Sequence, residues 1–100
     1  PLVNYRHAYH AGNHADVLKH VVLACVVERM KKKAKPFRVI DAHAGVGLYD
    51  LGGIEAGKTG EWEGGVGKLA EPFANEVEEL IAPYRAVLRA LNPQGGLRFY

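Results

Sequence analysis

One stretch of the sequence places an acidic side chain and two glycines where they could hold a small ligand. Asp41 is followed by three residues, then by Gly45, one further residue and Gly47. A glycine adopts positive φ readily and lets the backbone approach a ligand that a Cβ atom would exclude. A carboxylate can bind an amino group or a hydroxyl of such a ligand. The spacing therefore predicts a ligand-binding loop at residues 41–47.

The same spacing indicates which ligand the loop would hold. A dinucleotide-binding loop needs a third glycine three residues after the second, and Asp50 occupies that position. The order of the aspartate and the two glycines instead resembles the first motif of Rossmann-like methyltransferases, which faces the methionine half of S-adenosylmethionine. His43 departs from the pattern, because it stands where such motifs carry their first glycine. A plain strand-to-helix turn is the alternative interpretation.

A second group of chemically capable side chains lies near the start of the chain. Tyrosine, arginine and histidine cluster there: Tyr5, Arg6, His7, Tyr9 and His10. Bases of single-stranded RNA stack on such rings and attract arginine, although an arm packed against its own domain would have the same composition. His10 and His14 have the spacing of zinc ligands on a helix, but no zincin glutamate and no cysteine accompanies them. We therefore expect no metal.

A third stretch formally matches a phosphate-binding loop. Residues Gly52–Thr59 read glycine, four residues, glycine, lysine and threonine. Such a loop works when a buried strand precedes it and a helix follows it. The preceding residues make a poor strand, glycines follow the stretch, and Glu55 and Glu61 would repel phosphate. A phosphate-loop nucleotide hydrolase is therefore kept only as an alternative function.

Two strand-like segments are expected to support these sites. Phe37, Val39 and Ile40 are aromatic or β-branched and follow a proline, which predicts a buried strand that ends at Asp41. In open α/β sheets the carboxyl ends of the strands carry the ligand, so this strand would place residues 41–47 at a binding edge. Residues 97–100 are predicted to open a second, short strand.

Two helical segments are also expected. The apolar residues of 14–33 cover more than half of a helical circumference, so we predict a largely buried helix that Asn13 or Asp16 caps. Residues 66–91 are predicted to be mostly helical, and Pro83 should bend or divide that helix because proline lacks the N–H donor.

Composition bounds the class of protein. The chain has 100 residues, with 13 Lys and Arg against 11 Asp and Glu, which suits one small globular domain and neither favours nor excludes nucleic acid. Its single cysteine, Cys25, cannot form an internal disulfide, which favours a reducing compartment. No apolar run reaches membrane-spanning length, so we expect a cytoplasmic protein with no membrane partner.

Several runs of residues carry a more specific resemblance: Tyr5–His7, His10–His20, Lys35–Phe37, Asp41–Gly47, Tyr49, Thr59–Glu61 and Leu97–Tyr100. Together they closely resemble the RlmJ family of bacterial 23S ribosomal RNA (adenine-N6)-methyltransferases, over essentially the whole chain. The resemblance implies an α/β fold, a Rossmann-like class I S-adenosylmethionine-dependent methyltransferase with a helical insertion after the first strand. Residues 1–49 would hold the N-terminal arm, first helix, first strand and cofactor loop, residues 50–93 the insertion, and residues 94–100 the return to the core.

The resemblance also implies roles for individual residues. Five correspond to the cofactor site, as contacting histidines or as the wall of the glycine loop: His20, His43, Asp41, Ala44 and Gly45. Tyr5 corresponds to a tyrosine near the target adenosine, and Arg6 beside it is expected to contact the RNA. The expected partners are S-adenosylmethionine and 23S rRNA, and the expected state is a monomer. The family carries a threonine–glycine–glutamate element at Thr59–Glu61, which makes Lys58 incidental.

Methylation of an adenine amino group needs a residue that the sequence lacks. The exocyclic nitrogen is a poor nucleophile, so it needs in-line placement against the methyl group and an acceptor for its proton. Related enzymes use an Asp or Asn followed by two prolines and an aromatic residue, and this run is absent here. We therefore expect the proton acceptor after Tyr100 and a chain that is inactive alone. Val21, Val22 and Val26 would then stay uncovered.

Two alternatives from other classes of function are left open. One is the phosphate-loop hydrolase that would use Gly52–Thr59, and the other is a non-catalytic RNA-binding module that would use Tyr5–His14 and Lys31–Lys33. The basic run at 31–33 equally suits the carbonyl end of a helix dipole. Binding of S-adenosylmethionine without ATP would exclude the hydrolase, and methyl transfer would exclude the non-catalytic module.

Overall fold

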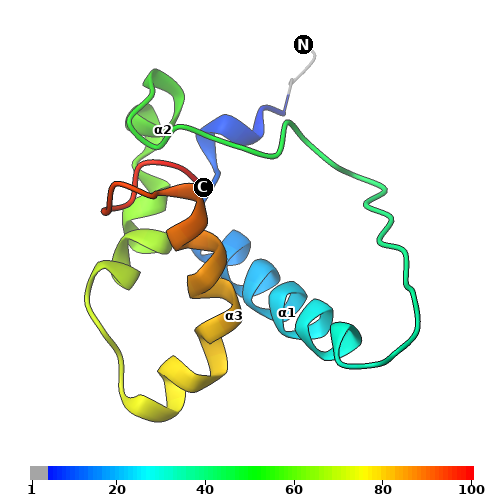
Figure 1. Ribbon diagram of the computed structural model, residues 1–100. Helices are drawn as coiled ribbons and strands as arrows, with labels where there is room; N and C mark the ends of the chain where they lie inside the picture. The colour runs from blue at the N-terminus through cyan, green and yellow to red at the C-terminus, as the bar shows by residue number, and fades with distance from the viewer. Residues whose placement is uncertain (1–4) are drawn as a thin grey trace.

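A computed structural model describes residues 5–100, so the first four residues of the predicted segment 1–49 lie outside the described residues. The elements, where η marks a 3-10 helix, are η1 (His7–Tyr9), α1 (His14–Lys31), α2 (Ile54–Thr59), η2 (Glu61–Gly64), η3 (Val66–Ala70) and α3 (Asn75–Leu91). The two long helices α1 and α3 pack against each other, and α2 packs against η1 (Figure 1). Within residues 5–100 no helix has the length and apolarity that a membrane crossing requires.

Helix α1 confirms the helix predicted for residues 14–33. Asn13 caps its start, because the Asn13 side-chain oxygen accepts a hydrogen bond of 2.9 Å from the Asp16 backbone N–H. Arg29 and Lys31 occupy its last turn, where positive charge is favourable against the helix dipole. Local sequence signals therefore set both ends of this helix.

The prediction that α1 is largely buried is wrong for the part of the chain that the structure describes. Only one stripe of the helix, with Val17, Val21 and Ala24, packs against the core. Five of its large apolar residues are exposed: Leu18, Val22, Leu23, Val26 and Met30. Helix α3 and the short helices cover one side of α1 only, so the remaining circumference has no described neighbour. The expected exposure is thus confirmed for Val22 and Val26 and wrong for Val21.

Helix α3 is one continuous element with Pro83 inside it, so the proline does not divide it. Its buried residues are Ile81, Tyr84 and Leu88, at the three- and four-residue spacing of a single helix face. Residues 66–70, which were predicted as part of the same helical stretch, form the separate 3-10 helix η3.

The core lies where α1, η3 and α3 meet. Its buried residues come from four segments: Leu51, Val66, Leu69, Ile81, Tyr84, Leu88 and Tyr100. Val66 has no exposed surface, and Val17 and Val21 of α1 contact the same cluster. The described residues are therefore built as helix on helix, with one face of α1 closing the core.

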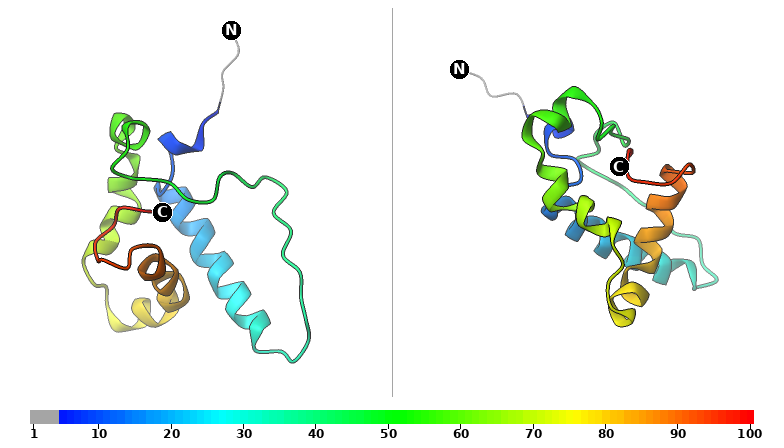
Figure 2. Two further views of the ribbon diagram at one scale, coloured as in Figure 1. Left: turned by 45° about the horizontal axis from the view of Figure 1, so that its top comes forward. Right: turned by 90° about the vertical axis from the view of Figure 1, so that its left-hand side faces the viewer.

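The strand predicted at Phe37–Ile40 is not formed. Residues 32–50 bow outward from the end of α1 and return toward α2 (Figure 1 and Figure 2). Val39 and Ile40 are 60% and 80% exposed, and no backbone hydrogen bond joins residues 36–40 to another described segment. A strand needs a neighbouring strand to pair its N–H and C=O groups, and residues 5–100 offer none at this place. The Rossmann-like α/β sheet is thus not present in the described residues.

The two ends of segment 51–98 are held side by side. Tyr49 and Tyr100 exchange backbone hydrogen bonds of 2.8 and 3.0 Å, and Leu51 N donates to Arg98 O at 2.7 Å. The residues between them, Asp50 and Phe99, form an isolated antiparallel bridge. We call this pairing of residues 49–51 with 98–100 the neck. The short strand predicted at 97–100 is reduced to this pairing.

Candidate functional site

A cleft of about 1240 Å³ lies between α1, residues 41–50 and the last turns of α3. It is lined by the seven residues to which the family resemblance gave a cofactor or RNA role: Tyr5, Arg6, His20, Asp41, His43, Ala44 and Gly45. The buried side chains of Tyr84, Leu88 and Tyr100 line the same cleft. Residues that lie far apart in the sequence thus share one cavity.

The predicted ligand loop has an open backbone in this structure. The Asp41 carboxylate accepts a hydrogen bond of 3.0 Å from the His43 backbone N–H, which turns the chain after Asp41. Gly47 has a φ of +85°, and a Cβ atom there would meet no atom within 4 Å. A Cβ atom on Gly45 would instead collide with the Tyr49 hydroxyl. The loop can therefore admit a ligand beside Gly47, and Tyr49 limits the space beside Gly45.

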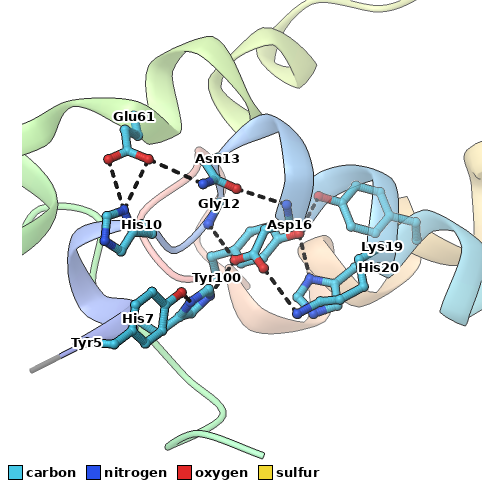
Figure 3. Close-up of polar contacts among 11 residues, drawn as sticks. Tyr5, His7, His10, Gly12, Asn13, Asp16, Lys19, His20, Glu61 and Tyr100 are labelled. Carbon is cyan, nitrogen blue, oxygen red and sulfur yellow. Dashed lines mark hydrogen bonds and ion pairs between the residues drawn. The ribbon is translucent and has the colours of Figure 1, made fainter. Parts of the chain in front are cut away.

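Asp16 is the centre of a polar network at the start of α1 (Figure 3). Its carboxylate is buried, with 4% of the residue exposed, and accepts hydrogen bonds from His7 Nε2 at 2.6 Å and Gly12 N at 3.0 Å. Lys19 Nζ lies 3.3 Å from its second oxygen. Burial would raise the pKa of Asp16, but the bonds from Gly12 and His7 outweigh that effect and lower it. Asp16 is therefore an ionised anchor between the N-terminal arm and α1.

Tyr5 stands at the exposed end of this network. His7 joins Tyr5 to Asp16, because its Nε2 donates to the Asp16 carboxylate and its Nδ1 lies 2.6 Å from the Tyr5 hydroxyl. The Tyr5 ring also stacks on His10, with ring centres 5.3 Å apart and planes at 9°. Tyr5 is 70% exposed. Its ring therefore presents a positioned flat face at the edge of the cleft.

The Arg6 side chain contacts different residues from those that Tyr5 contacts. Its guanidinium lies 3.2 Å from Glu55 of α2 and 5.8 Å from the centre of the Tyr9 ring. The arginine side chain is 59% exposed, so it lines the cleft while it contacts residues of the short helices. Its positive charge is partly matched by Glu55.

Glu61 joins the N-terminal arm to η2. It accepts from His10 Nδ1 at 2.9 Å and from the Asn13 side-chain amide at 3.2 Å. The amide of Asn13 is the larger cause of the lowered pKa of Glu61, and His10 adds to it. Thr59 completes the contact by donating to the Tyr9 carbonyl at 2.5 Å. The threonine–glycine–glutamate run at Thr59–Glu61 thus holds the arm.

Glycines allow the arm and the short helices to touch through their backbones. Val66 N donates to Gly12 O at 2.8 Å. A Cβ atom on Gly65 would collide with Gly12 O and would lie 2.5 Å from Asn13 C. Gly12 has a φ of +76°, and a Cβ atom there would lie 2.9 Å from Val66 Cγ1. Side chains at either position would push these segments apart.

His20 lies deeper in the cleft than Tyr5. Its Nδ1 lies 2.8 Å from the Tyr100 hydroxyl, and that hydroxyl lies 3.0 Å from the hydroxyl of Tyr84. Burial lowers the pKa of His20, and the negative charge of Asp16 opposes that effect. His20 is therefore the neutral imidazole of this cleft at neutral pH.

The stretch Gly52–Thr59 does not have the geometry of a phosphate loop. A phosphate loop leads into a helix whose positive end faces the ligand, whereas α2 ends at Thr59 and Gly60 adopts the left-handed conformation with φ 62°. Lys58 is therefore in the last turn of a six-residue helix. No strand precedes α2 among the described residues. In residues 5–100 no three His, Cys, Asp or Glu side chains form a metal-binding group, and His10 is paired with Glu61.

Sequence reasoning gave no role to Asp16, His7 or Glu61 in organising the site. Asp16 is three residues after the capping Asn13, the spacing of a capping box, so a local role at the helix start was foreseeable. Its bond to His7 joins residues that are nine apart across a turn at Gly12, and no periodic signal encodes such a contact. The resemblance singled out Thr59–Glu61 without a physical role, and the contact of Glu61 with His10 now supplies one.

Comparison with known proteins identifies the class of this chain. Residues 34–100 match the family described as "Ribosomal RNA large subunit methyltransferase D, RlmJ". The chain is 41% identical over 99 residues to ribosomal RNA large subunit methyltransferase J of Escherichia coli (strain K12). It is 45% identical over 100 residues to the protein of that name from Haemophilus influenzae (strain ATCC 51907 / DSM 11121 / KW20 / Rd). Both relatives thus carry the name of a ribosomal RNA large subunit methyltransferase.

Within that class, the chain belongs to the RlmJ family. The similarity covers 99% of this chain and 35% of each of the two relatives. The chain therefore spans about a third of the length of these proteins. The resemblance of its motifs to the RlmJ family is confirmed by the family match.

Proposed function

We propose that this chain forms one wall of the site of an S-adenosylmethionine-dependent methyltransferase that modifies the N6 amino group of an adenosine in 23S rRNA. The observation that carries the proposal is the single cleft that residues 5–6, His20 and residues 41–45 all line. The names of the relatives support methyl transfer to large-subunit ribosomal RNA. The choice of the adenine amino group comes from the motif resemblance.

The residues of the cleft fit the amino-acid half of S-adenosylmethionine. The exposed Asp41 carboxylate suits an ammonium group, and the imidazoles of His20 and His43 suit a carboxylate. Gly47 leaves room for close approach to the backbone. The cleft exceeds the roughly 300–1,000 Å³ typical of small-molecule pockets, which leaves space for a base beside the cofactor. When bound, S-adenosylmethionine supplies an electrophilic methyl group.

The N-terminal arm suits the other substrate. A base that is flipped out of its RNA stack is commonly held by stacking on an aromatic ring, and the exposed Tyr5 ring is positioned by His7 and His10 at the cleft edge. Arg6 adds positive charge for the RNA backbone. Tyr5 and Arg6 therefore place the base.

The Rossmann-like core is part of the same proposal. Residues 37–47 would add the first strand and the cofactor loop to a sheet formed with the further length that the relatives have, and residues 50–93 would be the helical insertion. The support is that Val39 and Ile40 are apolar, exposed and outside any helix. Burial of such residues on a neighbouring strand would stabilise the complete protein.

Two measurements on the full-length protein test the proposed function. Calorimetry should show binding of S-adenosylmethionine or its demethylated product and no binding of ATP. A methyl-transfer assay should show incorporation of the methyl group into 23S rRNA that lacks the modification. Binding of ATP alone would refute the proposal in favour of nucleotide hydrolysis, and binding of RNA without methyl transfer would leave only an RNA-binding module.

Single substitutions separate the two substrates of the cleft. Gly45→Val should abolish binding of S-adenosylmethionine, because the new side chain fills loop space that already contacts Tyr49. Gly57→Val is the matched control, since a Cβ atom there meets nothing within 4 Å and Gly57 does not line the cleft. Tyr5→Ala should lower methyl transfer strongly and leave cofactor affinity nearly unchanged. A Gly45→Val affinity within about threefold of wild type, under 1 kcal/mol, would refute the loop assignment.

A further inference from the structure

Three polar side chains in the lining of the cleft are joined by hydrogen bonds. They are His20 of α1, Tyr100 at the neck and Tyr84 of α3, and the two tyrosines also belong to the buried core. The Tyr100 hydroxyl is 2.8 Å from His20 Nδ1 and 3.0 Å from the Tyr84 hydroxyl. Figure 3 shows the contact between His20 and Tyr100. Neither tyrosine belongs to the motifs that define the cofactor loop.

Because both tyrosines are buried, the direction of these hydrogen bonds can be assigned. Tyr84 is 3% exposed and Tyr100 is 6% exposed. Each phenol carries one hydrogen, and a buried hydrogen without an acceptor is costly. Among the described residues, the Tyr84 hydroxyl is bonded only to Tyr100, and the Tyr100 hydroxyl only to Tyr84 and His20. The three groups therefore have to satisfy one another.

Only one arrangement gives both phenol hydrogens an acceptor. Tyr84 donates to the Tyr100 oxygen, and Tyr100 donates to His20 Nδ1. If His20 Nδ1 carried a hydrogen instead, it would occupy the Tyr100 oxygen and leave one of the two buried phenol hydrogens unpaired. His20 Nδ1 is thus an acceptor, so the ring hydrogen of the neutral imidazole is on Nε2.

We infer that Tyr100 is a positioning residue that holds His20 as the Nε2–H tautomer, so that His20 presents a hydrogen-bond donor to an anionic group in the cleft. This inference rests on the proposed function, in which that anion is the carboxylate of S-adenosylmethionine. An Nδ1–H tautomer would present a lone pair to the same carboxylate and repel it. The hydrogen bond from Tyr100 therefore decides whether His20 attracts or rejects the cofactor.

The electrostatic surroundings agree with this assignment. Burial raises the pKa of Tyr84 and of Tyr100, so both phenols keep their hydrogens. Burial also lowers the pKa of His20, an effect that Asp16 opposes and Lys19 assists. A neutral imidazole beside two protonated phenols is the state that the hydrogen-bond pattern requires.

The neck fixes the position of the Tyr100 ring. Tyr100 exchanges both of its backbone hydrogen bonds with Tyr49, at 2.8 and 3.0 Å, directly after the residues of the cofactor loop. Its ring contacts His20 with ring centres 5.3 Å apart. The donor to His20 is therefore tied to the end of the loop that would hold the same ligand.

The experiment compares two conservative variants of the full-length protein. Long-range ¹⁵N–¹H spectra of the histidine side chains report the tautomer, and His20→Gln assigns the His20 signals by their loss. The wild type should show the Nε2–H pattern. Tyr100→Phe should lose that pattern and bind S-adenosylmethionine about tenfold more weakly. Tyr84→Phe is the matched comparison: it also removes one buried hydroxyl but leaves Tyr100 able to donate, so it should keep the Nε2–H pattern and lose less affinity than Tyr100→Phe.

Distinct outcomes separate this inference from the proposed function. An Nδ1–H pattern in the wild type, or equal affinities of Tyr100→Phe and wild type, would overturn the inference and leave the proposed function standing. Equal losses of affinity in both tyrosine variants with an unchanged His20 spectrum would assign them a packing role and also overturn it. Failure of the wild type to bind S-adenosylmethionine would overturn the proposed function, and the spectra alone would then decide the tautomer.

Discussion

Replacing Asp16 with alanine is expected to detach the N-terminal arm from α1. The substitution removes the acceptor of His7 Nε2 and Gly12 N and the partner of Lys19. His7 and Lys19 are 25% and 63% exposed, so water can rehydrate both. Gly12 is buried, so its N–H is left unpaired at a cost of about 1–3 kcal/mol, and the lost charge-assisted bond from His7 adds a further part of its roughly 1.5–3 kcal/mol.

The expected loss of unfolding free energy is therefore about 2–4 kcal/mol, which overlaps the lower part of the roughly 3–5 kcal/mol for breaking a fully buried pair. Urea denaturation followed by circular dichroism measures it. Asp16→Asn is the control, because its amide oxygen can still accept one of the bonds while the charge is lost, so it should cost less than Asp16→Ala. Glu28→Ala, which removes an exposed 3.5 Å pair with Lys31, should cost almost nothing. A loss under about 1 kcal/mol for Asp16→Ala would refute the anchoring role.

Three further predictions follow from other contacts. Gly65→Ala should lower stability by about 1–3 kcal/mol, because the new methyl group collides with Gly12 O; thermal unfolding measures this, and an unchanged midpoint would contradict the close backbone approach. Arg85 lowers the pKa of Glu78 from 4.5 to about 2, so the pair stabilises the fold above pH 4.5 and loses its effect as the pH falls toward 2. The difference in stability between wild type and Glu78→Gln should therefore shrink over that range, and a difference independent of pH would argue against the ion pair. Lys58→Ala should leave methyl transfer near the wild-type rate, and a large loss would revive the phosphate-loop interpretation.

The sequence predicted those parts of the fold that local signals determine. Asn13 and the basic last turn mark α1, and the spacing of Ile81, Tyr84 and Leu88 marks α3. The strand at Phe37–Ile40 was predicted from residue type alone, and a strand also depends on partners that the described residues do not provide. The prediction that α1 is largely buried was wrong for a similar reason, since apolar residues are buried only where another element covers them.

The residues of the site were easier to predict than the contacts between them. The glycine spacing at residues 41–47 and the family resemblance led to His20, His43 and Tyr5, and the structure places all three on one cleft. The bonds of Asp16 with His7 and of Glu61 with His10 depend on how the chain turns at Gly12 and on how closely Gly65 lets the segments approach. Such contacts arise from tertiary packing, which residue spacing alone does not report.

The neck constrains how segment 51–98 can evolve. Because residues 49–51 lie against residues 98–100, the chain between them could grow or shrink without moving the residues on either side, as in a domain inserted at a single point. The contact between α1 and α3 works against that freedom. Any change on the inner face of α3 alters the support of α1, which carries Asp16, Lys19 and His20. Loop lengths inside the segment should therefore drift among relatives, while its helix that faces α1 should change only together with α1.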